Sequence, residues 1–169
     1  MDWTYVHLTT NHFPVVGAIF GTLILAWGIF KGERSVWSVG LWIMVFTGLI
    51  AIPVYLTGEP AEETVEHLPG VLESIIEEHE EFAKFGLISA IVSGIAALVS
   101  LAFLRRDPDG GKAKLLLFAT LALAAITVGT MGWTAKLGGV IRHAEIRAAG
   151  TQTTTTAVPQ GKKDDDDDH

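Results

Sequence analysis

Histidines and carboxylates are the side chains of this sequence with the clearest capacity for chemistry. Residues 58–81 contain nine glutamates and two histidines but no lysine or arginine. Imidazole and carboxylate groups together are ligands for zinc, iron, manganese and copper. Glu63 and His67 are four residues apart, which would place them on one face of a helix. We therefore predict a metal site formed by His12, His67, His79 and His143, with Glu63 or Glu59 as additional ligands or as partners of the imidazoles.

A b-type haem is an alternative cofactor for the same region. Two imidazoles that face each other across a helical bundle can bind the haem iron as axial ligands. His12 and His79, from the first and third apolar segments, are the pair expected to do so. Gly17, Gly21 and Gly86 would leave room for the flat macrocycle. Each histidine on its own is more often an interfacial hydrogen-bonding residue, so the prediction rests on the whole group.

Four long apolar segments must hold these residues in place. They contain no charged residue and cover residues 13–30, 35–57, 85–104 and 115–135. About 20 apolar residues suffice for a helix to cross a bilayer. We predict an all-α fold, an integral membrane four-helix bundle in up-down antiparallel order over residues 1–149, with an outer acidic segment that is partly helical. Residues 150–169, rich in threonine and aspartate, are expected to form a disordered tail.

Local sequence features predict how the helices begin and pack. Residues 1–12 are interpreted as a short polar and aromatic lead, and Asn11 or His12 is expected to cap the first span. Residues 60–67 predict two helical turns. Apolar residues recur at three- and four-residue spacing from Val71, which predicts an amphipathic helix that continues into the third span without a break. Small residues suited to close helix packing recur at Gly17, Gly21, Gly86, Ala90, Ser93, Gly94 and Ala97.

Charge asymmetry predicts the orientation in the membrane. The turns at 31–34 and 105–114 carry six of the twelve lysines and arginines, whereas the N-terminal lead and the acidic stretch carry none. The positive-inside rule then places both turns in the cytoplasm. The termini and the acidic loop would face the periplasm of a bacterial inner membrane. All six histidines fall on that side, and we interpret His7 and His169 as surface residues.

Composition excludes several classes of function. The chain has no cysteine, which rules out disulfides, thiolate metal sites and iron–sulfur clusters. The net charge is −7 and no basic patch is present, so nucleic-acid binding is not expected. No charged residue lies inside a predicted span, which argues against a proton pump or an ion-coupled transporter. The N-terminus lacks the positive region of a signal peptide, so the first apolar segment is expected to be retained as an anchor.

Five motifs give the chain a likeness to known proteins. They are Asn11-His-Phe-Pro14, Tyr55-Leu-Thr-Gly-Glu-Pro-Ala-Glu-Glu63, Glu66-His-Leu-Pro-Gly70, His79-Glu80 and Gly138-Gly-Val-Ile-Arg-His-Ala-Glu-Ile146. Over about residues 8–147 the chain resembles a group of uncharacterised bacterial four-helix membrane proteins. The first motif also resembles the His-Phe-Pro opening of a broader family of predicted membrane proteins, of unknown function, some of which are suspected to bind haem. The resemblance implies a bacterial source and four spans but no established activity.

Two functions from different classes are compatible with these features. The first is a small membrane subunit that carries iron, copper, zinc or a b-type haem at its periplasmic face and takes part in electron transfer. Its partners would be the lipid bilayer, other membrane or periplasmic redox subunits, or further copies of itself. The second is a non-catalytic accessory or scaffold subunit whose acidic outer face docks a basic partner in a larger membrane complex. In neither case is the chain expected to be an enzyme by itself.

Overall fold

The computed structural model describes residues 3–66, 71–106 and 110–142, which form helices and the short connections between them. In chain order the helices are α1 Trp3–Thr10, α2 His12–Lys31, α3 Arg34–Leu56, α4 Gly58–Val65, α5 Glu73–Arg106 and α6 Gly111–Arg142. Four helical stretches are long and apolar enough to cross a membrane: Trp3–Lys31, Arg34–Val65, Glu73–Arg106 and Gly111–Ile141. The predictions of an all-α chain and of four apolar helices that could span a membrane are therefore confirmed.

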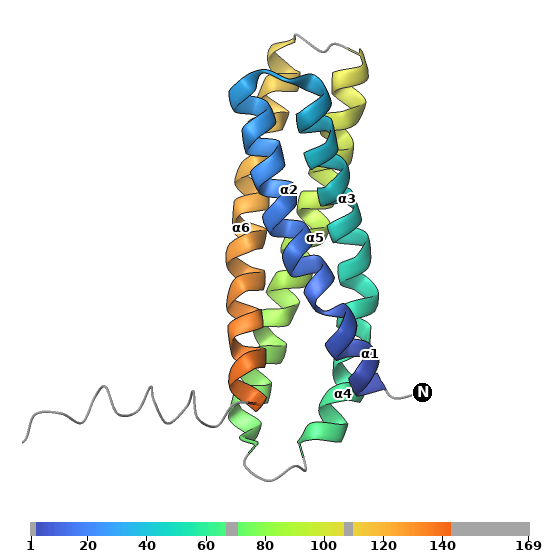
Figure 1. Ribbon diagram of the computed structural model, residues 1–169, viewed down its shortest axis with the longest axis vertical. Helices are drawn as coiled ribbons and strands as arrows, with labels where there is room; N and C mark the ends of the chain where they lie inside the picture. The colour runs from blue at the N-terminus through green and yellow to red at the C-terminus, as the bar shows by residue number, and fades with distance from the viewer. Residues whose placement is uncertain (1–2, 67–70, 107–109, 143–169) are drawn as a thin grey trace, which may run out of the picture.

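The four long helices form two antiparallel hairpins that lie side by side in a rod (Figure 1). The first hairpin consists of α2 and α3, and the second of α5 and α6. The end of α2 and the start of α3 lie at one end of the rod, as do the end of α5 and the start of α6. At the other end, α1 packs against α4, beside the start of α5 and the end of α6. The histidines that the structure describes all lie at this second end.

Glycines allow the two backbones of the first hairpin to come unusually close. A Cβ atom on Gly28 would collide with the backbone nitrogen of Trp37, and one on Gly40 would lie 2.6 Å from the backbone nitrogen of Leu25. No side chain fits at either position without moving the partner helix. In a bilayer, where water does not drive helices together, this close approach is a main source of attraction between helices.

Hydroxyl groups join the helices of the second hairpin. Among the described residues, three hydrogen bonds between hydroxyl groups cross from α5 to α6: Ser89–Thr130 at 2.8 Å, Ser93–Thr127 at 2.7 Å and Ser100–Thr120 at 2.9 Å. The small residues predicted to form a packing face on α5 are buried: Gly86, Ala90, Ser93, Gly94 and Ala97. That prediction is confirmed, and the serine hydroxyls satisfy their hydrogen bonds within the interface.

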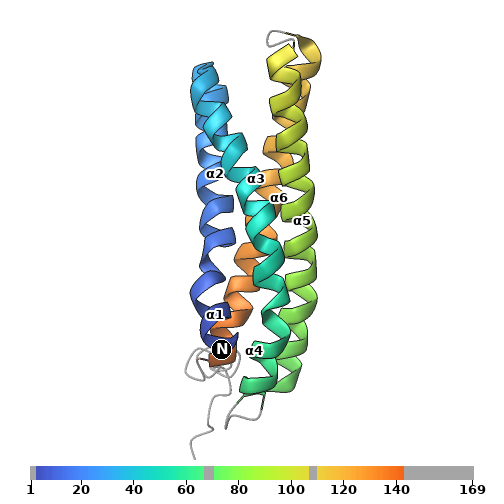
Figure 2. The same cartoon turned by 90° about the vertical axis from the view of Figure 1, so that its right-hand side faces the viewer.

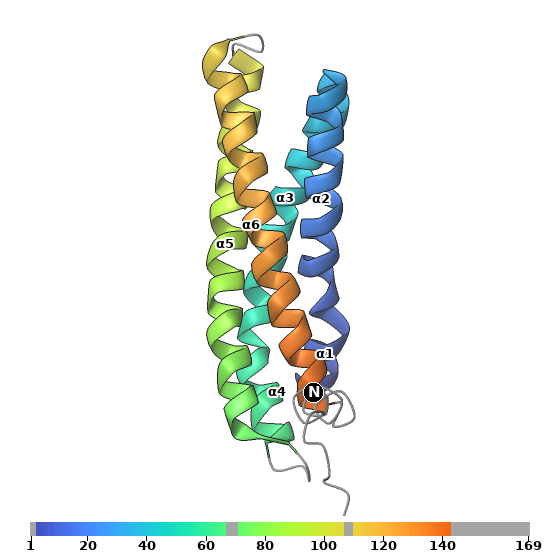
Figure 3. The same ribbon diagram turned by 90° about the vertical axis from the view of Figure 1, so that its left-hand side faces the viewer.

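The hairpins contact each other mainly through α3 and α5. A Cβ atom on Gly48 would lie 2.8 Å from the carbonyl oxygen of Ala90, and one on Gly94 would lie 3.3 Å from that of Met44. Beyond this crossing the hairpins diverge toward the end opposite α1 and α4 (Figures 2 and 3). The contact between α3 and α5 therefore determines how the two hairpins are placed relative to each other at the end that carries the histidines.

The N-terminal lead differs from its prediction. Residues 3–10 form α1, and the hydroxyls of Thr9 and Thr10 donate hydrogen bonds to the carbonyl oxygens of Tyr5 and Val6 at 2.8 Å each. The hydroxyls of these two threonines are thus satisfied within a helix that was not predicted. Asn11 connects α1 to α2 in a helical conformation and its side chain makes no capping hydrogen bond, so the predicted cap is wrong.

The acidic segment follows its prediction more closely. The helix predicted over 60–67 is α4, which begins earlier, at Gly58, and ends at Val65. The helix predicted from Val71 begins at Glu73 and continues into the third apolar segment without a break, as expected. Residues 67–70 and the predicted tail lie outside the described residues.

Candidate functional site

His79 is held in the groove between α5 and α6. Its Nδ1 atom lies 3.0 Å from the carbonyl oxygen of Thr134. The ring rests on Gly138, one turn further along α6, where a Cβ atom would lie 3.2 Å from its Cε1 atom. Any larger residue at 138 would push the imidazole away. The position of the ring is therefore set by one carbonyl group and one glycine.

His7 is held in the same way by the first hairpin. Its Nδ1 atom lies 3.1 Å from the carbonyl oxygen of Val54 and 3.2 Å from Oγ1 of Thr57. The ring faces Gly58, where a Cβ atom would lie 3.6 Å from its Cε1 atom. His7 is half-buried and bound to a neighbouring helix, so its interpretation as a surface residue is wrong. The unexpected helix α1 is what carries it into the bundle.

The hydrogen bonds determine the tautomer of both rings. A carbonyl oxygen can only accept, so Nδ1 of His7 and Nδ1 of His79 each carry a proton and donate it. In the neutral ring Nε2 then has a free lone pair. Among the described residues, neither Nε2 atom has a hydrogen-bond partner. Metal-binding histidines are commonly prepared in this manner, with the second ring nitrogen donating to a carbonyl group.

Burial favours the neutral form of both imidazoles. Both lie outside the uncharged segments predicted to cross the membrane. Burial lowers the pKa of His7, opposed by its hydrogen bond to Val54. Burial also lowers the pKa of His79, opposed by its bond to Thr134, and a proton on His7 lowers it further. Both imidazoles therefore favour the neutral form, in which Nε2 can act as a ligand.

His12 does not join this pair. It is the first residue of α2 and is exposed. Asn11 separates it from α1, the helix that contains His7. The space expected for a macrocycle beside Gly17 and Gly21 is also filled. A Cβ atom on Gly21 would lie 2.8 Å from Sδ of Met44, because both glycines face α3. Their role in close helix packing is confirmed, and their role in making room for a cofactor is wrong.

The carboxylates of α4 gather in a separate hollow. Glu59 and Glu63 line it together with Glu62, Glu66 and Glu80, around a volume of about 210 Å³. Burial raises the pKa of Glu62, and the charges of Glu80, Glu66 and Glu59 raise it further. Lys84 offsets part of this charge, because its Nζ atom lies 2.9 Å from a carboxylate oxygen of Glu80. Lys84 and Glu80 are both exposed, so this ion pair adds little stability.

The structure separates the predicted metal ligands that it describes. Glu80 faces the glutamates of α4, whereas its neighbour His79 contacts α6. Within residues 3–66, 71–106 and 110–142, no group of three or more histidines, aspartates and glutamates is arranged to hold a metal ion. His67 and His143 lie outside the described residues. The arrangement described is a pair of imidazoles beside an acidic hollow.

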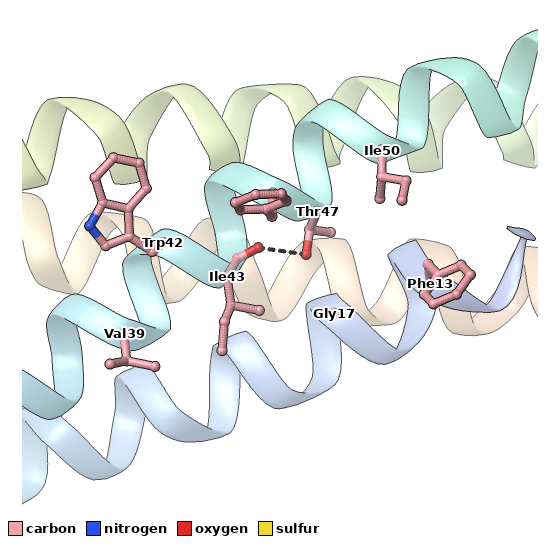
Figure 4. Close-up of a pocket in the computed structure, with 8 residues that line it drawn as sticks. Phe13, Gly17, Val39, Trp42, Ile43, Thr47 and Ile50 are labelled. Atoms are coloured by element: carbon pink, nitrogen blue, oxygen red, sulfur yellow. Dashed lines mark hydrogen bonds between the residues drawn. The ribbon is translucent and has the colours of Figure 1, made fainter.

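A second hollow lies on the outer surface of the first hairpin (Figure 4). It has a volume of about 350 Å³ and apolar walls formed by α2 and α3, including Phe13, Trp42 and Phe46. The hydroxyl of Thr47 also reaches it but donates to the carbonyl oxygen of Ile43 at 2.9 Å. With that donor engaged, the hollow offers mainly apolar side chains. Its position on the apolar segments suits contact with lipid.

Comparisons with known proteins find no match: no family model, no curated protein and no solved structure is similar to this chain. The resemblance drawn from the sequence motifs therefore stays an expectation, and the function has to be argued from the residues.

One signal for His7 was available in the sequence. His7 lies seven residues before Pro14, so on a continuous helix both point to the same side.

Proposed function

We propose that this chain is a small integral membrane subunit that carries a metal-containing redox cofactor at the end of the bundle formed by α1, α4 and the start of α5. The cofactor would take up one electron from one redox partner and pass it to another. The observation that carries the proposal is the state of His7 and His79. Both rings are half-buried and fixed with Nδ1 protonated, so both present Nε2 as a ligand.

The proposal includes the placement of the chain in the membrane. The four apolar helices would cross a bacterial inner membrane in up-down order, with both termini and α4 on the periplasmic side. Basic residues support this orientation, because Lys31, Arg34, Arg105 and Arg106 lie at the end of the rod opposite the histidines. A cofactor on the histidine side would be accessible to periplasmic partners.

Purification of the full chain in detergent from bacterial membranes tests the proposed function. We expect about one equivalent of a transition metal per chain, measured by elemental analysis, and loss of that metal in His79→Ala. Glu73→Gln is a matched control, because Glu73 lies on the exposed first turn of the same helix and outside the acidic hollow. Protein that is monodisperse and helical but contains no stoichiometric metal would refute the function.

The acidic hollow favours a second candidate, a scaffold subunit without a cofactor. Five glutamates converge there, from α4, the residue that follows it and α5, with Lys84 at the edge of the hollow. Such a concentration of charge attracts a basic partner mainly by accelerating encounter, and the attraction is screened beyond about 8 Å at physiological salt. Binding of a basic c-type cytochrome should then weaken with added salt and in Glu59→Gln/Glu63→Gln/Glu66→Gln, and persist in His79→Ala. Binding independent of ionic strength would eliminate this candidate.

A further inference from the structure

The two hairpins repeat the same pattern of buried residues when they are aligned on their histidines. In α2 the buried positions lie 7, 11, 14, 18 and 21 residues after His7, from Pro14 to Gly28. In α5 residues at these same distances from His79 are also buried, from Gly86 to Ser100. The alignment also equates Phe13 with Phe85, Ala18 with Ala90 and Ile19 with Ile91. The first helix of each hairpin therefore shares one register relative to its histidine.

The second helices repeat one another when they are aligned on the carbonyl groups that accept from the histidines. Buried residues lie 3, 7, 10 and 14 positions before Val54 in α3 and before Thr134 in α6. The glycine that faces each imidazole, Gly58 or Gly138, lies four positions after its carbonyl. The helices α2 and α5 run in one direction along the rod, and α3 contacts α5 while α2 contacts α6, an arrangement that fits an approximate two-fold axis along the rod. His7 and His79 are equivalent residues about that axis.

From this equivalence we propose that His7 and His79 bind a single b-type haem between the two hairpins, as its two axial ligands. The inference rests on the proposed function and names its cofactor. Two protein ligands are too few for most metal ions, and no third histidine or carboxylate joins the pair among the described residues. A haem supplies four equatorial nitrogens itself and takes from the protein two imidazoles on opposite faces. A pair related by a two-fold axis suits that geometry.

Two polar atoms on the same side of α1 support a ligand at this place. Thr4 and Asn11 lie three residues before and four residues after His7, so all three share one helical face. Oγ1 of Thr4 and Oδ1 of Asn11 are buried and have no hydrogen-bond partner among the residues that the structure describes. Buried polar atoms without a partner are uncommon in folded proteins. A ligand with polar substituents beside His7 would satisfy them.

Spectra of the full chain purified from haem-replete cells test the proposal. We expect a Soret band, one haem b per chain by pyridine haemochromogen assay, and the spectrum of a low-spin haem with two nitrogen ligands. His7→Ala and His79→Ala should each lower haem content by at least about tenfold, since each removes an axial ligand. His12→Ala is the matched control and should retain haem, because His12 is exposed. Metal without a Soret band would overturn this inference and leave the proposed function standing.

Two further sets of variants separate ligation from a structural role. His7→Met and His79→Met should keep the haem and raise its reduction potential, because methionine is also an axial ligand. A histidine with only a structural role would leave the potential unchanged, which would overturn the proposal.

Gly138→Ala should tilt His79 and lower haem affinity severalfold, whereas Gly58→Ala should change it little. The added methyl group would lie 3.2 Å from the ring of His79 in the first case and 3.6 Å from the ring of His7 in the second. Equal haem loss in His12→Ala and His7→Ala would also refute the assignment.

Discussion

Ser93 and Thr127 form a 2.7 Å hydrogen bond between α5 and α6, and both side chains are fully buried. Hydrogen bonds between helices in a membrane contribute about 0.6 kcal/mol on average and up to about 1.7 kcal/mol. We expect a coupling energy in this range from a double-mutant cycle of Ser93→Ala and Thr127→Val, measured by unfolding in mixed micelles. Ser38→Ala is the control, because the exposed Ser38 hydroxyl bonds only within its own helix. A coupling energy of zero would contradict the prediction.

Replacing Gly28 by alanine should destabilise the first hairpin. The added methyl group would collide with the backbone of Trp37, so the helices must separate. Overpacking of this kind typically costs about 1–3 kcal/mol. Gly129→Ala is the matched control, because no atom lies within 4 Å of a Cβ atom at that position. It should leave the thermal midpoint unchanged or raise it, since alanine favours a helix by about 0.5–1 kcal/mol over glycine. Equal effects of the two substitutions would argue against the close contact.

Single cysteines introduced into this cysteine-free chain should report its orientation. A cysteine at Glu33, in the turn between α2 and α3, should be protected from a membrane-impermeant maleimide in intact spheroplasts. One at Glu63 in α4 should be labelled, because α4 lies at the opposite end of the rod. Labelling at position 33 and protection at position 63 would reverse the orientation. Labelling at both positions would contradict a single membrane crossing by α3.

The acidic hollow should make stability depend on pH through Glu62. Its carboxyl group lies outside the apolar segments, and its pKa is raised by burial and by nearby glutamates. The folded chain therefore holds this proton more tightly than the unfolded chain, so stability is lost as pH rises from about 4 to 7. Glu62→Gln should raise the thermal midpoint at pH 7 and have little effect at pH 4. Glu73→Gln, outside the hollow, should not show this trend, and a Glu62→Gln effect independent of pH would contradict the mechanism.

The helical fold could be predicted from the sequence because its long uncharged apolar segments have one simple interpretation. An uncharged apolar stretch such as 85–104 is a helix in a bilayer whatever its neighbours are, since its backbone must satisfy its own hydrogen bonds. The packing faces were readable for a similar reason. The spacing of Gly17 and Gly21 indicates close approach to another helix, although it does not say which helix, and α3 proved to be the partner.

The candidate site was less predictable because it depends on contacts between distant segments. The place of His12 at the start of an apolar segment favours it over His7 as a ligand, yet His12 is exposed and His7 is half-buried in the structure. The carbonyl group of Val54 carries no signal in its side chain, so its bond to His7 could not be inferred. The repeated register of buried residues could have been found by aligning the chain on its histidines.

The glycine contacts of the first hairpin bear on how the chain is made. Gly28 meets Trp37 and Gly40 meets Leu25, so the closest backbone contacts of α2 and α3 lie within a single short stretch of sequence. Chains are synthesised from the N-terminus, and early segments can associate before later ones emerge. If the chain is inserted into a membrane as proposed, the first hairpin could therefore associate before the second hairpin has been synthesised. The second hairpin would then dock onto a prefolded template, and any cofactor held by both could enter only at this last step of assembly.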